Sequence, residues 1–129
     1  MNHRHAFLGC LTLAILTMSS NGVSAPQAAD EPRTIEVLAM RFAFEPSTIE
    51  VTEGERIRLA VKSGDGVHGV EIKKFRVNKE IPRGGDPVVI EFTANEAGRF
   101  PIICSAFCGD GHGDMKGMLV VLARPADTR

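Results

Sequence analysis

The 129-residue sequence has little excess charge, with 15 basic and 16 acidic side chains, and no basic patch stands out along it. This argues against nucleic acid as a partner, because nucleic-acid-binding domains gather Lys and Arg on one face. No serine or carboxylate pair stands beside a base in a catalytic arrangement, so hydrolysis has no support in the sequence. No amphipathic stretch is long enough for a convincing helix, which leaves strands as the main expected elements.

Long apolar runs are also missing, except for Ala6–Met18 near the N-terminus. That run is too short to span a bilayer, which needs about 20 residues. It follows Arg4 and precedes the small residues Val23-Ser24-Ala25, and this order is typical of a secretory signal peptide. The alternative is an uncleaved membrane anchor. We predict an exported, periplasmic or extracytoplasmic protein without a membrane span in its mature form. Its expected parts are a signal peptide (1–25), a linker (26–33), one domain (34–123) and a C-terminal tail (124–129).

Short alternations of apolar and polar residues recur along the predicted domain and are separated by turn residues. The clearest is Arg56–Lys62, where Ile57, Leu59 and Val61 alternate with mostly charged side chains. An alternation of period two indicates strands that bury one face. Comparable runs are expected to form strands at 35–39, 49–51, 67–75, 88–93, 99–104 and 118–122. About seven or eight short strands in one small domain predict an all-β sandwich or barrel.

Cysteine and histidine are scarce, and signal cleavage would leave only Cys104, Cys108, His68 and His112. Three of these belong to the pattern C-x3-C-x3-H-x2-M, which ends at Met115 in a glycine-rich loop between two predicted strands. Thiolate, imidazole and thioether ligands select soft metals, and one Cys, two His and a weak Met form the blue-copper set. The additional Cys104 would let two sulfurs bridge two copper ions, with one imidazole for each ion.

Other interpretations use the same residues. Cys104 and Cys108 could form a disulfide, because paired cysteines in exported proteins are usually bridged. Two Cys and two His could also hold zinc, although the methionine and the strand context favour copper. His68 could be an exposed residue at a strand end, and Met115 could pack in the core.

The loop C104-S-A-F-C108-G-D-G-H112-G-D-M115 resembles the CuA domain of cytochrome c oxidase subunit II and the equivalent domain of nitrous oxide reductase. Upstream, Asp65-Gly66-Val67-His68 resembles the strand end that supplies the first histidine of that family. The resemblance implies a cupredoxin fold, which is a Greek-key β-sandwich, and a centre of two copper ions. The ligands that it implies are His68, Cys104, Cys108, His112 and Met115, together with the backbone carbonyl of Ala106.

Three differences from subunit II affect the expected function. Only a signal-like segment stands where subunit II usually has a transmembrane hairpin, and the chain has no Trp or Tyr for an electron entry point. Ala106 replaces the acidic residue of the family's C-x3-C loop. We therefore expect a free-standing electron carrier that is not an enzyme. Its partner would be a redox protein such as a c-type cytochrome or a terminal oxidase or reductase. The alternative is an exported copper carrier or copper-site assembly protein that holds one copper in the same loop.

Overall fold

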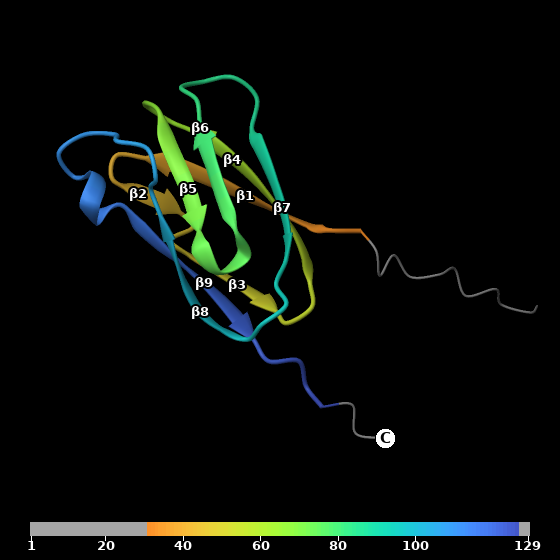
Figure 1. Cartoon of the computed structure of the whole chain (residues 1–129). Coiled ribbons are helices and arrows are strands. Elements are labelled where there is room, and N and C mark those ends of the chain that lie inside the picture. Colours follow the sequence, from red (N-terminus) through yellow and green to blue (C-terminus); the bar gives the residue numbers. More distant parts are fainter. Residues whose placement is uncertain (1–30, 127–129) are drawn as a thin grey trace, which may run out of the picture.

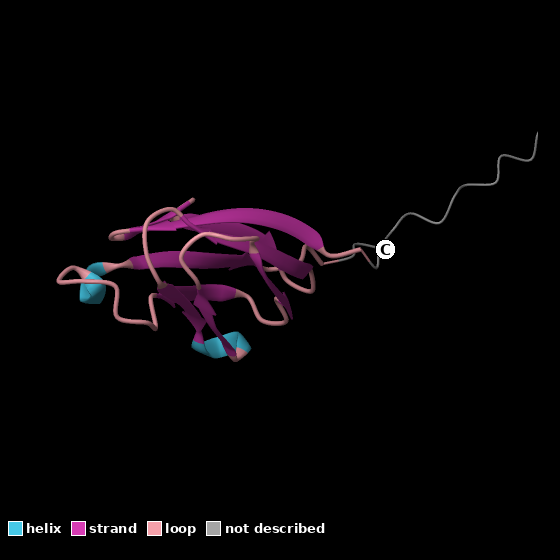
Figure 2. Cartoon of the chain, turned by 90° about the horizontal axis from the view of Figure 1, so that it is seen from above, coloured by secondary structure: helices cyan, strands magenta, loops and turns pink. Residues whose placement is uncertain are grey.

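The computed structural model describes residues 31–126 as a sandwich of two β-sheets (Figures 1 and 2). The predicted signal peptide and the first part of the linker lie outside the described residues. One sheet has the order β2-β1-β4-β7. Its strands are β1 (Arg33–Met40), β2 (Ala43–Glu45), β4 (Arg56–Ser63) and β7 (Val88–Thr93). The other sheet has the order β3-β9-β8-β5-β6. Its strands are β3 (Thr48–Thr52), β5 (His68–Ile72), β6 (Val77–Ile81), β8 (Gly98–Ile103) and β9 (Lys116–Leu122).

The all-β sandwich predicted from the alternation pattern is therefore confirmed. Strands β1 and β4 pair in parallel, as do β3 and β9, whereas the other pairs are antiparallel. The helical elements of this part of the chain are two 3-10 turns, η1 (Lys73–Phe75) and η2 (His112–Asp114). Within residues 31–126, no helix has the length and apolar character needed to cross a membrane.

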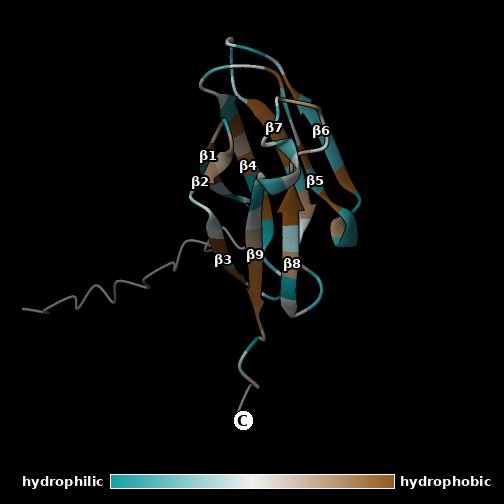
Figure 3. Cartoon of the chain, turned by 90° about the vertical axis from the view of Figure 1, so that its left-hand side faces the viewer, coloured by the Kyte–Doolittle hydropathy of each residue, from teal (hydrophilic) through white to brown (hydrophobic). Residues whose placement is uncertain are grey.

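The core lies between the two sheets and follows directly from the period-two pattern. In β4, Ile57, Leu59 and Val61 are at most 1% exposed, while the alternate positions are more exposed. Ile49 and Val51 of β3, on the opposite sheet, belong to the same buried cluster. Figure 3 shows hydrophobic stretches along the strands, including much of β9. Removal of these aliphatic side chains from water is the main stabilising contribution expected for a domain of this kind.

One strand prediction needs correction, and two strands were not predicted. The strand expected over 67–75 ends at Ile72, because the chain then forms η1, which Arg76 closes in a left-handed conformation with φ of 55°. Strand β6 was not predicted, because its three central side chains are exposed and only Val77 and Ile81 are buried. It lies at the edge of its sheet. Strand β2 has only three residues, which is too short for an alternation pattern to be detected.

One end of the sandwich gathers four loops that are far apart in the sequence. The register pairs Met40 with Ala43 and Ser63 with Ala39 in one sheet. In the other sheet it pairs His68 with Ile81 and Ile103 with Lys116. The β1–β2, β4–β5, β6–β7 and β8–β9 connections consequently meet at this end, toward the upper left of Figure 1. The residues that carry the candidate chemistry lie in or beside these loops.

Candidate metal centre

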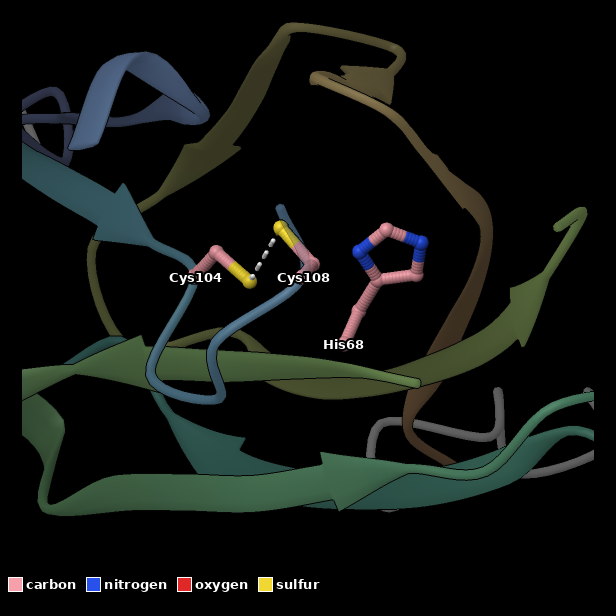
Figure 4. Close-up of side chains that lie close together, drawn as sticks. All are labelled: His68, Cys104 and Cys108. Carbon is pink, nitrogen blue, oxygen red and sulfur yellow. Dashed lines mark hydrogen bonds between the residues drawn. The ribbon is translucent and has the colours of Figure 1, made fainter. Parts of the chain in front are cut away.

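His68 is the first residue of β5 and its side chain is completely buried. Its Nε2 atom lies 2.7 Å from Oδ1 of Asp65. The other ring nitrogen, Nδ1, is buried and has no hydrogen-bond partner. Figure 4 shows one ring nitrogen of His68 directed toward the two cysteine sulfurs. Buried polar atoms are rarely left unpaired, so the unpaired nitrogen of His68 is a candidate ligand for a metal ion.

The sulfurs of Cys104 and Cys108 lie 3.7 Å apart and form no disulfide (Figure 4). A disulfide would require an S–S distance of about 2.05 Å. Both cysteines are buried, and one potential ligand atom from each, together with one from His68, lie within 4.8 Å of one another. The bridged form considered for these two cysteines is therefore not the form present in this structure.

Burial raises the pKa of the Cys108 thiol to about 11, and the hydrogen bond and charge of Cys104 add to this effect. The positive charge of Arg41 acts in the opposite direction. Cys108 is thus a neutral thiol near neutral pH in the absence of a cation. A metal ion that bound here would displace this proton, because the thiolate is the form that ligates metals.

The remaining predicted site residues surround the same sulfurs. Nδ1 of His112 lies 3.8 Å from Sγ of Cys108, and Sδ of Met115 lies 3.7 Å from the same atom. The backbone carbonyl oxygen of Ala106 lies 3.1 Å from Sγ of Cys104. Met115 is 1% exposed, so it is packed in the interior, yet its sulfur faces the cluster. All six residues named from the sequence are thereby brought together at one end of the sandwich.

Backbone hydrogen bonds give the loop its shape. The N–H of His112 donates to the carbonyl of Gly109 at 3.0 Å, and the N–H of Met115 donates to the carbonyl of His112 at 3.2 Å. The N–H of Cys104 donates to the carbonyl of Met115 at 3.2 Å and closes the loop. Turn η2 therefore directs both the imidazole of His112 and the thioether of Met115 toward Cys108.

Gly69 lets strand β5 approach the cysteine loop. Its N–H donates to Sγ of Cys104 at 3.4 Å. A Cβ atom at this position would lie 2.3 Å from Oγ of Ser105 and 2.6 Å from the backbone nitrogen of Ala106. Those distances are far below van der Waals contact, so only glycine fits between His68 and the loop that carries the sulfurs.

The segment before His68 was expected only as the strand end that supplies the histidine, and the supporting role of its other residues was missed. The N–H groups of Asp65 and Gly66 donate to Oγ of Ser63 at 3.3 and 3.2 Å, which fixes the turn. The backbone N–H of Arg41 and the imidazole of His68 both hydrogen-bond the Asp65 carboxylate and hold its pKa below the usual range. The one sequence signal was the run of turn-forming residues S-G-D-G, which Val67 separates from the histidine.

Two phenylalanines give this end of the molecule an apolar surface. Phe107, within the cysteine loop, is 76% exposed, and its ring centroid lies 5.7 Å from that of His112. Phe42 is 38% exposed and packs so closely on the loop that a Cβ at Gly111 would lie 2.3 Å from its ring. The apolar surface beside His112 is compatible with a close contact between this end and another protein.

The chemistry of these donors fits copper. Two thiols, two imidazoles and a thioether are soft or borderline ligands, and the thioether in particular is typical of copper sites. The buried Nδ1 of His68, which has no partner, is the structural observation that supports such a ligand role. The cluster of His68, Cys104, Cys108 and Met115 is therefore consistent with copper binding.

Comparison with known proteins agrees with the fold. The sequence profile of the cupredoxin-like domain matches residues 9–121. The chain belongs to the cupredoxin-like domain family. It is also 34% identical over 95 residues to cytochrome c oxidase subunit 2 of Thermus thermophilus, an alignment that covers 74% of this chain and 70% of that relative.

Solved structures show the same relationship. A chain in a cryo-EM structure of a heme-copper terminal oxidase dimer is 26% identical, with a TM-score of 0.62 over 69% of this cupredoxin and 64% of that chain. The periplasmic domain of subunit II of cytochrome oxidase from Bradyrhizobium japonicum is 19% identical and shares the fold. Its TM-score is 0.63 over 70% of this chain and 83% of that domain. This cupredoxin thus resembles the periplasmic domain of subunit II, and it spans 56% of a second T. thermophilus subunit 2 sequence.

Proposed function

We propose that this cupredoxin is an exported electron-transfer protein with a two-copper centre of the CuA type. The proposed ligands are the side chains of His68, Cys104, Cys108, His112 and Met115 and the backbone carbonyl of Ala106. Copper would supply reversible one-electron chemistry at this site, and no catalysis of a substrate reaction is proposed.

The observation that carries the proposal is the pair of unbridged buried thiols beside an imidazole nitrogen without a partner. The two sulfurs lie 3.7 Å apart, and Nδ1 of His68 is buried without a hydrogen bond. A single-copper site would need only one of the two thiols. The presence of both, with His68 and His112 on different segments, supports two metal ions with one imidazole each.

The protein contributes a set of ligands held by the sheets. His68 begins β5, Cys104 directly follows β8, and Met115 directly precedes β9. These strands belong to one sheet, so the positions of these three ligands are fixed by the strand ladder. The geometry of a rigid ligand set changes little when the centre gains or loses an electron, and this favours fast electron exchange.

The proposed partner is a redox protein such as a c-type cytochrome or a terminal oxidase or reductase. Relatives named as cytochrome c oxidase subunit 2 support this choice, and so does the exposed ring of Phe107 beside His112. Export is proposed from the signal-like segment over 1–25, and the solved relative described as a periplasmic domain supports it.

Ligand variants test the proposal through metal content and spectra. The reduced protein, its Cys104→Ser variant and its Met115→Leu variant would be loaded with copper, counted for metal and examined by absorption and electron spin resonance. Met118→Leu is the matched control, because this half-buried methionine lies in β9 opposite Thr48 and Pro101.

We expect Cys104→Ser to lose the two-copper signal, Met115→Leu to change the spectrum, and Met118→Leu to match the wild type. Retention of the full metal count and spectrum by Cys104→Ser would contradict the two-copper proposal. One readily exchanged copper in the wild type, with slow electron exchange with a cytochrome, would identify a copper carrier instead.

A further inference from the structure

Arg41 contacts both segments that carry the proposed ligands, although nothing in the sequence marked it as part of the site. It lies in the connection between β1 and β2. Its backbone N–H donates to Oδ2 of Asp65 at 2.9 Å, and its side-chain Nε–H donates to the carbonyl oxygen of Cys108 at 2.8 Å. Asp65 in turn holds His68. One residue thereby links the turn that orients His68 with the loop that carries the cysteines.

Gly66 leaves space for the Arg41 side chain, and Gly109 lies within ordinary contact distance of it. A Cβ atom at Gly66, in the turn before His68, would lie 3.1 Å from a terminal nitrogen of the guanidinium. A Cβ at Gly109, directly after Cys108, would lie 3.9 Å from Nε. The guanidinium therefore lies between the two loops, in contact distance of each.

The guanidinium also places a permanent positive charge beside Cys108, because arginine is not deprotonated in proteins. A nearby cation favours any change that adds negative charge to the site, and the gain of an electron is such a change.

We propose that Arg41 is a positioning residue that fastens the cysteine loop to the His68 turn and that its charge raises the reduction potential of the copper centre. The effect on the potential rests on the proposed function, whereas the fastening of the loop can be measured without metal. The hydrogen bond from Nε is charge-assisted and therefore stronger than a neutral one. Its loss should free the loop at Cys108 while the backbone contact to Asp65 remains.

The test compares two variants of Arg41 with a control in the full chain. Arg41→Met removes both the charge and the Nε donor, whereas Arg41→Lys keeps the charge but lacks the Nε–H group that contacts the Cys108 carbonyl. Arg83→Gln is the charge control, because Arg83 is exposed in the β6–β7 loop at the same end of the sandwich. Three quantities are measured: the reduction potential, the rate of copper release to a chelator, and amide hydrogen exchange in the metal-free protein.

We expect Arg41→Met to lower the potential and to release copper about tenfold faster, as the loss of one charge-assisted hydrogen bond implies. Arg41→Lys should keep a potential near that of the wild type and still release copper faster. In the metal-free Arg41→Met protein, the amides of His112 and Met115 should exchange faster while those of β4 do not change. Arg83→Gln should match the wild type in each measurement.

Several results would overturn parts of this proposal. Equal reduction potentials for Arg41→Met and the wild type would show that the charge of Arg41 does not set the potential. An unchanged rate of copper release and unchanged amide exchange in the cysteine loop of Arg41→Met would show that Arg41 does not hold this loop in place. If the wild type bound no copper, the proposed function would fail, and amide exchange in the metal-free protein would still decide whether Arg41 holds the loop.

Discussion

The close approach of β5 to the cysteine loop makes Gly69→Ala a severe test of the site geometry. The added Cβ would lie 2.3 Å from Oγ of Ser105 and 2.8 and 2.6 Å from the backbone nitrogens of Ser105 and Ala106. The serine hydroxyl can rotate away, but the two backbone atoms cannot. The loop must therefore move outward by about 1 Å to reach ordinary contact distances. That movement would separate Cys104 from His68 and lengthen the 3.4 Å contact from the Gly69 N–H to the Cys104 sulfur.

Overpacking of this kind costs about 1–3 kcal/mol of folding stability, and displaced ligands should weaken copper binding by at least about tenfold. The assay measures denaturant unfolding of the metal-free protein and competition for copper with a chelator. Gly113→Ala is the matched control, because no atom of a residue beyond its chain neighbours lies within 4 Å of a Cβ at this position in the same loop. Wild-type copper affinity in Gly69→Ala, or equal losses in the two variants, would refute the reasoning.

Three further predictions follow from the burial and hydrogen bonds of single residues. Asp65→Asn should weaken copper binding about 10- to 100-fold by loosening the imidazole of His68, and an unchanged affinity would show that the carboxylate has no orienting role. Because the pKa of Asp65 is lowered in the folded protein, its contacts stabilise the metal-free fold above the ordinary carboxyl pKa. This contribution is lost as the pH falls through the lowered value, so acid titration should destabilise the wild type more than Asp65→Asn. With a pKa of about 11, Cys108 should be alkylated roughly a hundredfold more slowly at pH 8 than an ordinary cysteine. Its rate should rise steeply toward pH 11, and mass spectrometry of the modified peptide would reveal ordinary reactivity if the argument is wrong. Leu59→Ala should cost about 2–5 kcal/mol, because Leu59 is 1% exposed, whereas Val89→Ala at 55% exposure should stay within about 0.5 kcal/mol. Similar denaturation midpoints for the two variants would contradict the assignment of the core.

The strands that bury one face were predictable from the sequence, including the edge strands β3 and β7, whereas the edge strands β2 and β6 were not. Arg56–Lys62 lies within β4 because its alternation places each apolar residue in the core. Strand β6 exposes Asn78, Lys79 and Glu80, so its sequence carries almost no alternation, and its pairing with β5 decides its conformation. The turn η1 was missed for a different reason, because an apolar phenylalanine at its end extends the apparent strand pattern.

The convergence of the proposed ligands was predictable because most of them share one short loop. His68 could be assigned from the resemblance of its strand end, and β5 places it against that loop. The supporting contacts of Arg41, Asp65 and Gly69 could not be assigned. They depend on which segments meet at the end of the sandwich, and this is a property of the packed sheets. The predicted signal peptide and its cleavage near Ala25 remain predictions.

The most direct test of the central claim is copper loading of the reduced protein, with metal counted per chain and the electron spin resonance spectrum recorded. The proposed site predicts two copper ions per chain and one unpaired electron whose signal is split by both nuclei. One copper per chain with splitting by a single nucleus would contradict the two-copper centre, and Cys104 would then be a spare or regulatory thiol.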